Sequence, residues 1–509
     1  MQGQTKGRSF GRVAAVLTAM ALFLSFASAQ QAATHSWLGY AHDPQHSGVS
    51  AVAAQPLSNI HWSTPVDLHP PDGEILIHYG SPLITAANTV IVPVKSGTDS
   101  FRVEAHSGTD GTLLWTQKTA YHAPSAGFLP SFSPVLTHNR LYIPGKGGTV
   151  LVREDPDQPT GKVIKRVFYG MQNYEADRQT YDTNVEINTP ITADSQGNIY
   201  FGFLVLGPTP IGLQSGLARI SGSGVASSIT GASAAVDPQV SEVNMCSAPA
   251  LSPDEGTLYV GMNSPSAGYG YLVSLNSQTL QTLATVRLKD PSSGLDAWIL
   301  DASSASPTVG PDGDIYLGVL ENPFPAHNDR GWLLHFDSTL TQAKTPGSFG
   351  WDDTPSIVPA SLVSSYQGAS SYLLMTKYNN YAEVGTGDGV NKIAILDPNA
   401  TESDPVISSV RVMNEVLTIK GVTPDPDFPN LPNAVREWCI NAAVVDPHTK
   451  SVLVNSEDGK LYRWDLARNR FKQIITLSSG IGEAYTPTVI GRDGTAYAIN
   501  DAILFAIGK

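Results

Sequence analysis

The sequence is poor in charge, in cysteine and in long apolar runs. Only 15% of its 509 residues are charged, against about 25% in an average globular protein, which argues against helices with charged outer faces. Two cysteines exclude a disulfide scaffold. No basic tract is present and the formal net charge is −14, so binding to the phosphate backbone of nucleic acids is excluded as a function.

The one long apolar run lies at the N-terminus. It extends from Val13 to Phe26, follows three basic residues and ends before the small residues Ala27 to Ala29, as in a cleaved secretory signal peptide. It is shorter than the ~20 residues of a membrane span. We therefore expect residues 1–29 to be removed, which leaves 28 Lys and Arg against 45 Asp and Glu, a net charge of −17. The mature protein should be exported, secreted or periplasmic, with no membrane span.

The rest of the chain repeats one unit. A Pro, a short apolar run, a polar turn and a second apolar run with Tyr recur, with Pro-to-Tyr offsets of ten, ten, nine and ten. The four clear copies are Pro190 to Gly202, Pro249 to Gly261, Pro307 to Gly318 and Pro487 to Ala498. Weaker copies begin at Pro82, Pro134, Pro355 and Ala443, which makes eight copies in all. Such a period indicates a repeat architecture.

Each copy has the composition of β-strands rather than of helices. The runs are short and rich in β-branched and aromatic residues, and turns such as Asp312-Gly313 and Asp493-Gly494 suit tight hairpins. Four antiparallel strands at this period predict an all-β fold, an eight-bladed β-propeller. Seven blades remain the alternative if the long interval from 355 to 443 has been divided wrongly.

The two ends of the chain predict how the ring closes. The last copy, Pro487 to Gly508, holds only three strands, and the stretch from Asn59 to Thr64 is an orphan strand. Pairing the two would complete the last blade and leave no open edge. We therefore expect a signal peptide (1–29), an N-terminal extension (30–58) and a single propeller domain (59–509).

The repeats resemble a known family. The stretch from Ala105 to Trp115 is similar to the end of a pyrroloquinoline-quinone-type (PQQ-like) repeat, and the Pro-to-Tyr units are similar to its beginning. The resemblance covers nearly all of the mature chain and implies a quinoprotein-type propeller. Its motifs are structural and occur both with and without a cofactor, so fold alone does not settle function.

Candidate site residues lie where one copy leads into the next. In a propeller these connections gather on one face around the channel mouth, so acids and aromatics far apart in sequence should converge there. The ligand-binding candidates are His78, Tyr79, Glu186, Asp301, Trp351, Arg436, Trp438 and Glu483. The adjacent carboxylates Asp352 and Asp353 are the metal candidates, because calcium prefers oxygen ligands.

The cysteines leave two alternatives open. Cys246 and Cys439 precede the first strands of the fourth and seventh copies. Export favours oxidation, but these copies are not neighbours, so a disulfide and two buried thiols are both consistent with the sequence. The quinoprotein alcohol dehydrogenases of the resembled family hold PQQ with a disulfide between adjacent cysteines above a Trp floor. No adjacent pair exists here, and Cys-x-x-Cys-His is absent as well.

Three function classes follow. We favour an exported binding or scaffold propeller with a ligand or cation at the channel mouth. A quinoprotein-type oxidoreductase, dependent on PQQ and calcium, would use Asp301 or Asp352 as base. A glycan-active lyase would use His78, Tyr79 or Tyr485 as base and acid, with Arg436 neutralising a uronate. We expect a small polar ligand or a protein partner at the propeller face, no nucleic acid, and a monomer.

Overall fold

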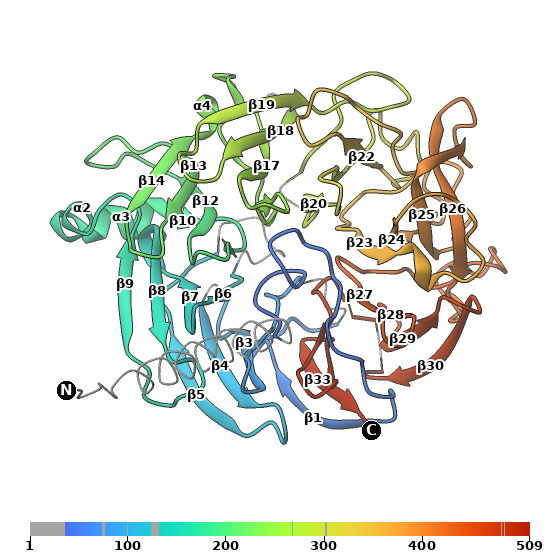
Figure 1. Ribbon diagram of the computed structural model, residues 1–509, viewed down its shortest axis with the longest axis horizontal. Coiled ribbons are helices and arrows are strands. Elements are labelled where there is room, and N and C mark those ends of the chain that lie inside the picture. The colour runs from blue at the N-terminus through green and yellow to red at the C-terminus, as the bar shows by residue number, and fades with distance from the viewer. Residues whose placement is uncertain are drawn as a thin grey trace, which may run out of the picture.

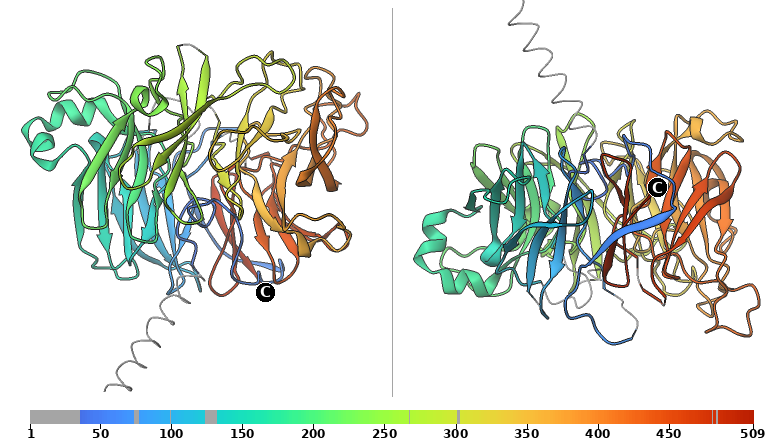
Figure 2. Two further views of the ribbon diagram at one scale, coloured as in Figure 1. Left: turned by 45° about the horizontal axis from the view of Figure 1, so that its top comes forward. Right: turned by 90° about the horizontal axis from the view of Figure 1, so that it is seen from below.

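A computed structural model gives the arrangement of residues 36–73, 77–98, 100–123, 132–266, 268–300, 303–479, 481–482 and 484–509. Eight antiparallel sheets stand around one central axis (Figure 1), and their strands run from one face of the ring to the other (Figure 2). The prediction of an eight-bladed β-propeller is confirmed, and the seven-bladed alternative is wrong. The expected signal peptide, 1–29, lies outside the described residues. Within the described ranges, no helix has the length and apolar character to cross a bilayer.

The first four blades follow one another in chain order. Blade 1 consists of β2 (Leu83–Ile84), β3 (Thr89–Lys95), β4 (Phe101–Ser107) and β5 (Leu113–Lys118). Blade 2 consists of β6 (Val135–Thr137), β7 (Arg140–Pro144), β8 (Thr149–Glu154) and β9 (Val163–Val167). In the next two blades the first strand is split. Blade 3 consists of β10 (Val185–Ile187), β11 (Thr192–Ala193), β12 (Ile199–Val205), β13 (Gly216–Ile220) and β14 (Ala226–Thr230). Blade 4 consists of β15 (Glu242–Val243), β16 (Ala250–Leu251), β17 (Thr257–Ser264), β18 (Tyr269–Asn276) and β19 (Thr282–Arg287).

The remaining blades complete the ring. Blade 5 has three strands, β20 (Thr308–Val309), β21 (Ile315–Val319) and β22 (Trp332–Phe336). Blade 6 consists of β23 (Ser356–Pro359), β24 (Tyr372–Tyr378), β25 (Lys392–Ser403) and β26 (Arg411–Lys420). Blade 7 consists of β27 (Val444–Asp446), β28 (Ser451–Asn455), β29 (Lys460–Asp465) and β30 (Arg470–Thr476). Blade 8 consists of β31 (Val489–Ile490), β32 (Ala496–Asn500), β33 (Ile503–Gly508) and β1 (Asn59–Pro65).

Among the described residues helices are few and short, about 5% of the chain. Two of them, α2 (Met171–Ala176) and α3 (Arg178–Asn184), occupy the connection between blades 2 and 3, which the sequence analysis treated as a loop. The Asp177 side chain caps α3 by accepting the N–H of Thr180. The others are α4 (Gly231–Ala235) and the 3₁₀ turns η1 (Lys146–Gly148) and η2 (Ala360–Leu362).

The ring is closed by its two chain ends. β1 pairs antiparallel with β33 in a register that sets Asn59 opposite Gly508 and Pro65 opposite Ile503. In Figure 1 the blue β1 and the red β33 lie side by side. The last blade thus takes its outer strand from the start of the chain and its other three from the end, so that β1 covers the edge of β33 within one sheet.

The repeated tyrosines occupy one structural position. Tyr200, Tyr259, Tyr316 and Tyr497 all lie on the second strand of their blades and are almost fully buried. Each stands opposite a first-strand residue, as Tyr259 does opposite Ala250. The predicted equivalence of these positions is confirmed.

The described part of the N-terminal extension forms a belt around the axis. We call residues 37–50 the belt, and the face on which it lies the belt face, which also carries the hairpins between the first and second strands (Figure 1). In six blades a first-strand N–H donates to a belt carbonyl at 2.7–2.9 Å. The donor–acceptor pairs are Ile84–Trp37, Leu136–Leu38, Leu251–Pro44, Val309–Gln45, Ile357–Ser47 and Val445–Gly48.

The belt also plugs the channel. The Tyr40 hydroxyl reaches the axis, where it donates to the Asn441 side chain and lies 3.0 Å from Thr354 Oγ1. From the opposite side His78 and Tyr485 close the channel, and a cavity of only about 30 Å³ remains between them and Tyr40. Gly48 fits where no other residue would, because a Cβ there would stand 2.8 Å from the carbonyl oxygen of Ala443.

The buried tyrosines give a test of the fold. We expect Tyr259→Ala to lower the free energy of unfolding by about 3–5 kcal/mol, as for other large buried aromatic side chains. Tyr259→Phe is the matched control, since it removes only the hydroxyl that donates to the Ser338 carbonyl at 2.7 Å, a loss of about 1 kcal/mol. Denaturant unfolding measures both. Equal effects of the two substitutions would contradict the burial of the ring.

Candidate functional site

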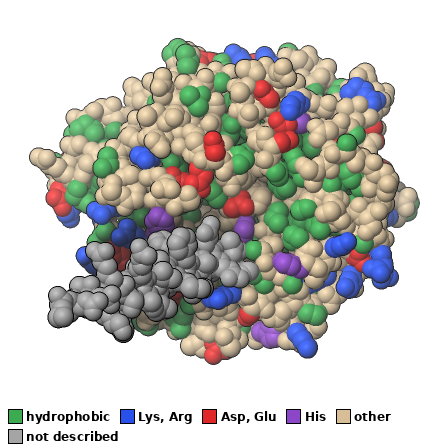
Figure 3. All heavy atoms as spheres, in the orientation of Figure 1, with side chains coloured by type: hydrophobic (Ala, Val, Ile, Leu, Met, Phe, Trp, Pro, Cys, Tyr) green, Lys and Arg blue, Asp and Glu red, His purple; other side chains and the backbone are tan. Residues whose placement is uncertain are grey.

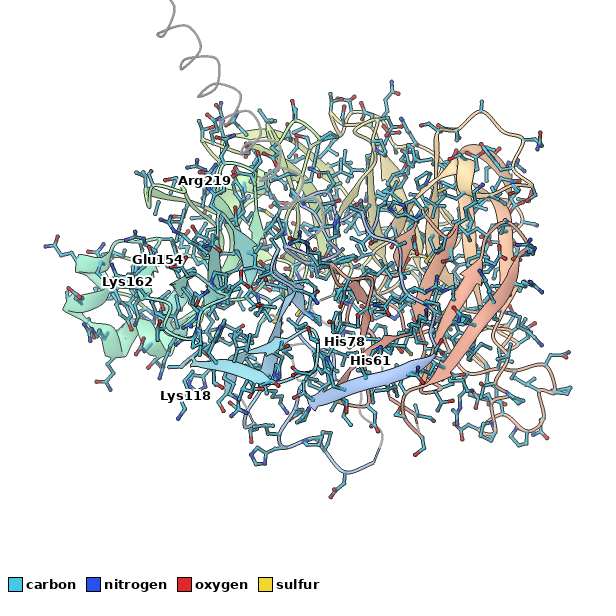
Figure 4. The ribbon with its side chains drawn as sticks, turned by 60° about the horizontal axis from the view of Figure 1, so that its bottom comes forward. His61, His78, Lys118, Glu154, Lys162 and Arg219 are labelled. Carbon is cyan, nitrogen blue, oxygen red and sulfur yellow. The ribbon has the colours of Figure 1, made fainter. Side chains whose placement is uncertain are left out.

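The predicted site residues lie on the face opposite the belt, which we call the mouth face. Here the last strand of each blade leads into the first strand of the next. His78 and Tyr79 precede β2, Trp351 to Asp353 precede β23, Arg436 and Trp438 precede β27, and Glu186 lies on β10. Figure 4 labels His78 nearer the middle of the ring than Lys118. Asp301 and Glu483 lie outside the described residues.

Two of these segments, those of His78 and of Asp352 and Asp353, contribute to one cluster around Lys377. His78 Nε2 is 3.9 Å from Asp352 Oδ2, and the His78 ring lies against the Tyr485 ring with centroids 3.9 Å apart. Lys377 Nζ lies 4.7 Å from the centroid of the same Tyr485 ring. We call His78, Asp329, Asp352, Asp353, Lys377 and Tyr485 the mouth cluster.

Lys377 is the unusual member of the cluster. It lies on β24 opposite Ile393 and is fully buried. Its Nζ has no hydrogen-bond partner within the described part of the chain. A buried ammonium without partners is costly, so it depends on the carboxylates around it. Burial, followed by the charge of Lys377, holds the pKa of His78 well below its usual value.

The carboxyl groups of the cluster are held in fixed positions. Asp352 Oδ1 accepts the Ser304 N–H and the Ser304 hydroxyl, both at 2.7 Å, and Asp353 accepts the Thr376 hydroxyl. Burial raises the pKa of Asp352, and it raises that of Asp353 to about 7, although Lys377 opposes both shifts. Burial and the charge of Glu321 raise the pKa of Asp329 to about 7. Several acids therefore titrate near neutral pH, as is common at functional sites.

A second group of ligand atoms lies beside this cluster. Atoms of Glu437, Cys439 and Glu457 lie within 4.8 Å of one another, an arrangement that could hold a metal ion. Glu457 accepts the Glu437 N–H at 2.8 Å and the Cys439 thiol at 3.3 Å. Burial and the neighbouring Glu457 raise the pKa of Glu437 to about 8.

Several predicted residues are engaged elsewhere. Arg436 Nη1 is 2.6 Å from an Asp427 carboxylate oxygen and 3.1 Å from one of Asp425. Trp438 is buried against Tyr462, with ring centroids 5.1 Å apart, so it is a core residue and no stacking surface. The Tyr79 hydroxyl donates to Asp67 at 3.1 Å. Arg436 is thus paired with two carboxylates and Trp438 packs in the core, and a part for either residue in ligand binding stays a prediction.

Cys246 and Cys439 are not joined by a disulfide in the structure. Both residues are buried as thiols. They open blades 4 and 7, which are not adjacent in the ring, and the Cys439 Sγ points to Glu457. Of the two alternatives that the sequence left open, the structure shows the buried thiols.

The sequence analysis missed Lys377, Asp329 and Glu457. Lys377 lies inside a strand. The feature of the sequence that could have indicated it is the single Lys in the run from Tyr372 to Tyr378. Asp329 and Glu457 lie in connections between second and third strands, which also reach the mouth face.

Comparison with known proteins supports the fold. No protein-family model and no curated protein matches the chain. Among solved structures, a europium-containing methanol dehydrogenase is similar over 91% of this chain and 89% of its own, with a TM-score of 0.55 and 11% identity. The quinohemoprotein alcohol dehydrogenase from Comamonas testosteroni is similar over 93% of this chain and 77% of its own, with a TM-score of 0.53 and 11% identity. At this identity the likeness shows that the chain has the propeller fold of these quinoproteins.

The raised pKa of Asp353 predicts a pH dependence of stability. An acid whose pKa is higher in the folded state binds more protons there, so stability falls as the pH rises from about 4, its unfolded value, to about 7. Asp353→Asn abolishes this titration. We expect the variant to gain stability relative to the wild type between pH 4 and pH 8, by up to about 1.4 kcal/mol per unit of pKa difference.

Urea unfolding at several pH values measures this difference. Asp110→Asn is the matched control, because Asp110 is an exposed turn residue whose pKa is lowered by the N–H of Thr112. Its effect should be small and of opposite sign. A stability difference for Asp353→Asn that does not vary with pH would contradict the assignment.

Proposed function

We propose that this chain is an exported binding protein whose mouth cluster takes a divalent cation, alone or carried by a small polar ligand. The observation that supports it is the crowding of buried carboxyl groups around one ammonium. Asp329, Asp352 and Asp353 all have raised pKa values, and Lys377 is the cation whose charge acts on each of them. Buried carboxyl groups that repel one another are stabilised as anions by a cation.

The available ligand atoms suit two kinds of cation. Carboxylate oxygens such as those of Asp352 and Asp353 suit a hard ion such as calcium. The neighbouring group of Glu437, Cys439 and Glu457 adds a thiol, which suits a softer ion such as zinc. Calcium and zinc are therefore the two probes of the proposal.

A quinoprotein-type oxidoreductase is the alternative, and the described residues do not fit its cofactor. PQQ carries three carboxylates, whereas the mouth cluster is itself rich in acids with Lys377 as its cation. Arg436 is engaged by Asp425 and Asp427, and the channel leaves a cavity of about 30 Å³. The chain also has no adjacent cysteines. The engagement of Arg436 argues equally against a lyase that would use it to neutralise a uronate.

Export and the monomeric state remain part of the proposal. The basic start, the apolar run and the small residues at Ala27 to Ala29 support a cleaved leader. The closed ring, with its last blade completed by the same chain, is consistent with a protein that needs no second copy to fold.

Thermal melting with and without metal ions tests the proposed site. We expect millimolar calcium or micromolar zinc to raise the melting temperature of the wild type above its value in EDTA, because a ligand that binds only the folded state stabilises it. The double substitution Asp352→Asn with Asp353→Asn should relieve repulsion and stabilise the protein in EDTA. It should also remove the calcium effect.

Two controls make the result specific. Glu437→Gln should affect the zinc response more than the calcium response, since Glu437 belongs to the thiol-containing group. Glu175→Gln, at an exposed position on α2, should leave both responses unchanged. If neither ion raises the melting temperature of the wild type, the cation site does not exist.

A further inference from the structure

The belt bonds to six of the eight blades, and blade 3 is the one it passes over between two bonded blades, whereas blade 8 lies beyond its two ends. Its carbonyls accept a first-strand N–H in blades 1 and 2, then in blades 4, 5, 6 and 7. Between successive blades the acceptor advances by one or two residues, as from Pro44 to Gln45. From blade 2 to blade 4 it advances from Leu38 to Pro44. Within the described residues, no belt carbonyl reaches the first strand of blade 3.

The intervening belt residues turn away from blade 3. The His42 N–H closes a turn by donating to Gly39 at 3.2 Å, while Tyr40 enters the channel. Ala41 and His42 have φ values of 48° and 87°, in the left-handed region that residues other than Gly seldom adopt. Such strain persists where the surrounding structure imposes it. The belt is therefore held off blade 3 in a defined shape.

Ala193 on β11 is the residue left without a belt partner. Asp194 donates its N–H to Asn198 at 3.0 Å, so the alternation of an antiparallel ladder makes Ala193–Ile199 the pair without mutual hydrogen bonds. The Ala193 N–H and C=O therefore face the axis, as those of Ile84 do in blade 1, where both groups bond to Trp37. No described residue accepts the Ala193 N–H.

A large cavity occupies this gap. It measures about 720 Å³, within the range of ligand pockets. Leu38 and Pro44 from the belt, Leu136 from β6, and Ile191 and Ala193 from blade 3 give it an apolar floor. The cavity thus combines apolar side chains with the main-chain N–H and C=O groups of Ala193.

The rim of the cavity is acidic. Asp43, Asp157, Asp194 and Glu255 line it, and the lining among the described residues includes no Lys or Arg. Acidic and His side chains are visible around the centre of this face in Figure 3. The carboxylates already accept hydrogen bonds from protein groups, as Glu255 does from the Ser195 N–H. They therefore make the rim negative, and the main chain of Ala193 is the part of the cavity that can bond directly to a ligand.

We propose that this cavity binds an extended peptide segment of a partner protein, with apolar side chains and at least one Lys or Arg. The segment pairs with β11 through the Ala193 N–H and C=O and so takes the place that the belt leaves vacant in blade 3. Strand addition of this kind obtains affinity from main-chain hydrogen bonds and specificity from side-chain pockets. The acidic rim selects the cationic residue. The site lies on the opposite face from the mouth cluster and does not depend on it.

Selection from a peptide library tests the proposal. A phage-displayed library of random seven-residue peptides is selected on the mature wild-type protein and depleted on Ala193→Phe, which places a bulky ring at the cavity wall. The retained sequences should alternate apolar residues with Lys or Arg. The most enriched peptide is then synthesised, and its dissociation constant is measured by fluorescence anisotropy.

The expected changes in affinity are specific. Ala193→Phe should weaken binding at least about tenfold, equivalent to about 1.4 kcal/mol, and Glu255→Lys should weaken it similarly by reversing a rim charge. The exposed Glu175→Gln should leave the affinity unchanged. N-methylation of the peptide backbone at the pairing residue should weaken binding, and the bound peptide should slow hydrogen exchange of the Ala193 amide. Melting curves of each variant confirm that it is folded.

Three outcomes would overturn the proposal. In the first, the wild type retains no sequence over Ala193→Phe. In the second, the selected peptide binds Glu255→Lys as tightly as the wild type. In the third, N-methylated peptides bind unchanged and hexylamine competes with them, so that the cavity takes a small amphipathic cation and no strand. None of these outcomes bears on the metal response of the mouth cluster.

Discussion

Eight first strands direct main-chain N–H and C=O groups at a common axis, and the need to pair those groups shapes the rest of the molecule. Unpaired polar groups of a buried backbone are costly. The belt meets this need in six blades with hydrogen bonds of 2.7–2.9 Å. Because it does so from inside, the same segment fills the channel with Tyr40 and confines ligand access to the two faces. The two candidate sites lie on these faces and are separated by the plugged channel.

The two faces differ in how they handle charge. On the mouth face the acids are buried together, and burial raises their pKa values, a shift that the charge of Lys377 offsets only in part. On the belt face the acids at the cavity rim accept hydrogen bonds from nearby groups, as Asp194 does from Asn198 and Tyr200 and Glu255 does from Ser195. On the mouth face a bound cation would stabilise the buried carboxyl groups as anions. On the belt face the acids form a negative rim around an apolar floor. The same residue types therefore favour different ligands on the two faces.

Much of the fold could be predicted from the sequence because it is periodic. The Pro-to-Tyr spacing marks the first and second strands, and Tyr200, Tyr259, Tyr316 and Tyr497 are matched in burial because each packs in the same place in its blade. The belt could not be predicted, since residues 37–50 form few local elements and gain their order from contacts with six blades. The candidate site on the mouth face was harder to predict than the fold. Trp438 and Arg436 carry the composition of a binding loop but pack or pair locally, whereas Lys377 is concealed within a strand.

The joining of β1 to β33 has a consequence for how the chain reaches this state. Asn59 pairs with Gly508, so blade 8 joins two strands that are separated in the sequence by all seven other blades. Contacts of such high sequence separation form slowly. Until the six residues of β33 are synthesised, blade 8 lacks its third strand. The ring of blades around the belt is then incomplete. A chain that lacks β33 therefore cannot complete blade 8, and it exposes the strand edges of β1 and β32 that β33 otherwise covers.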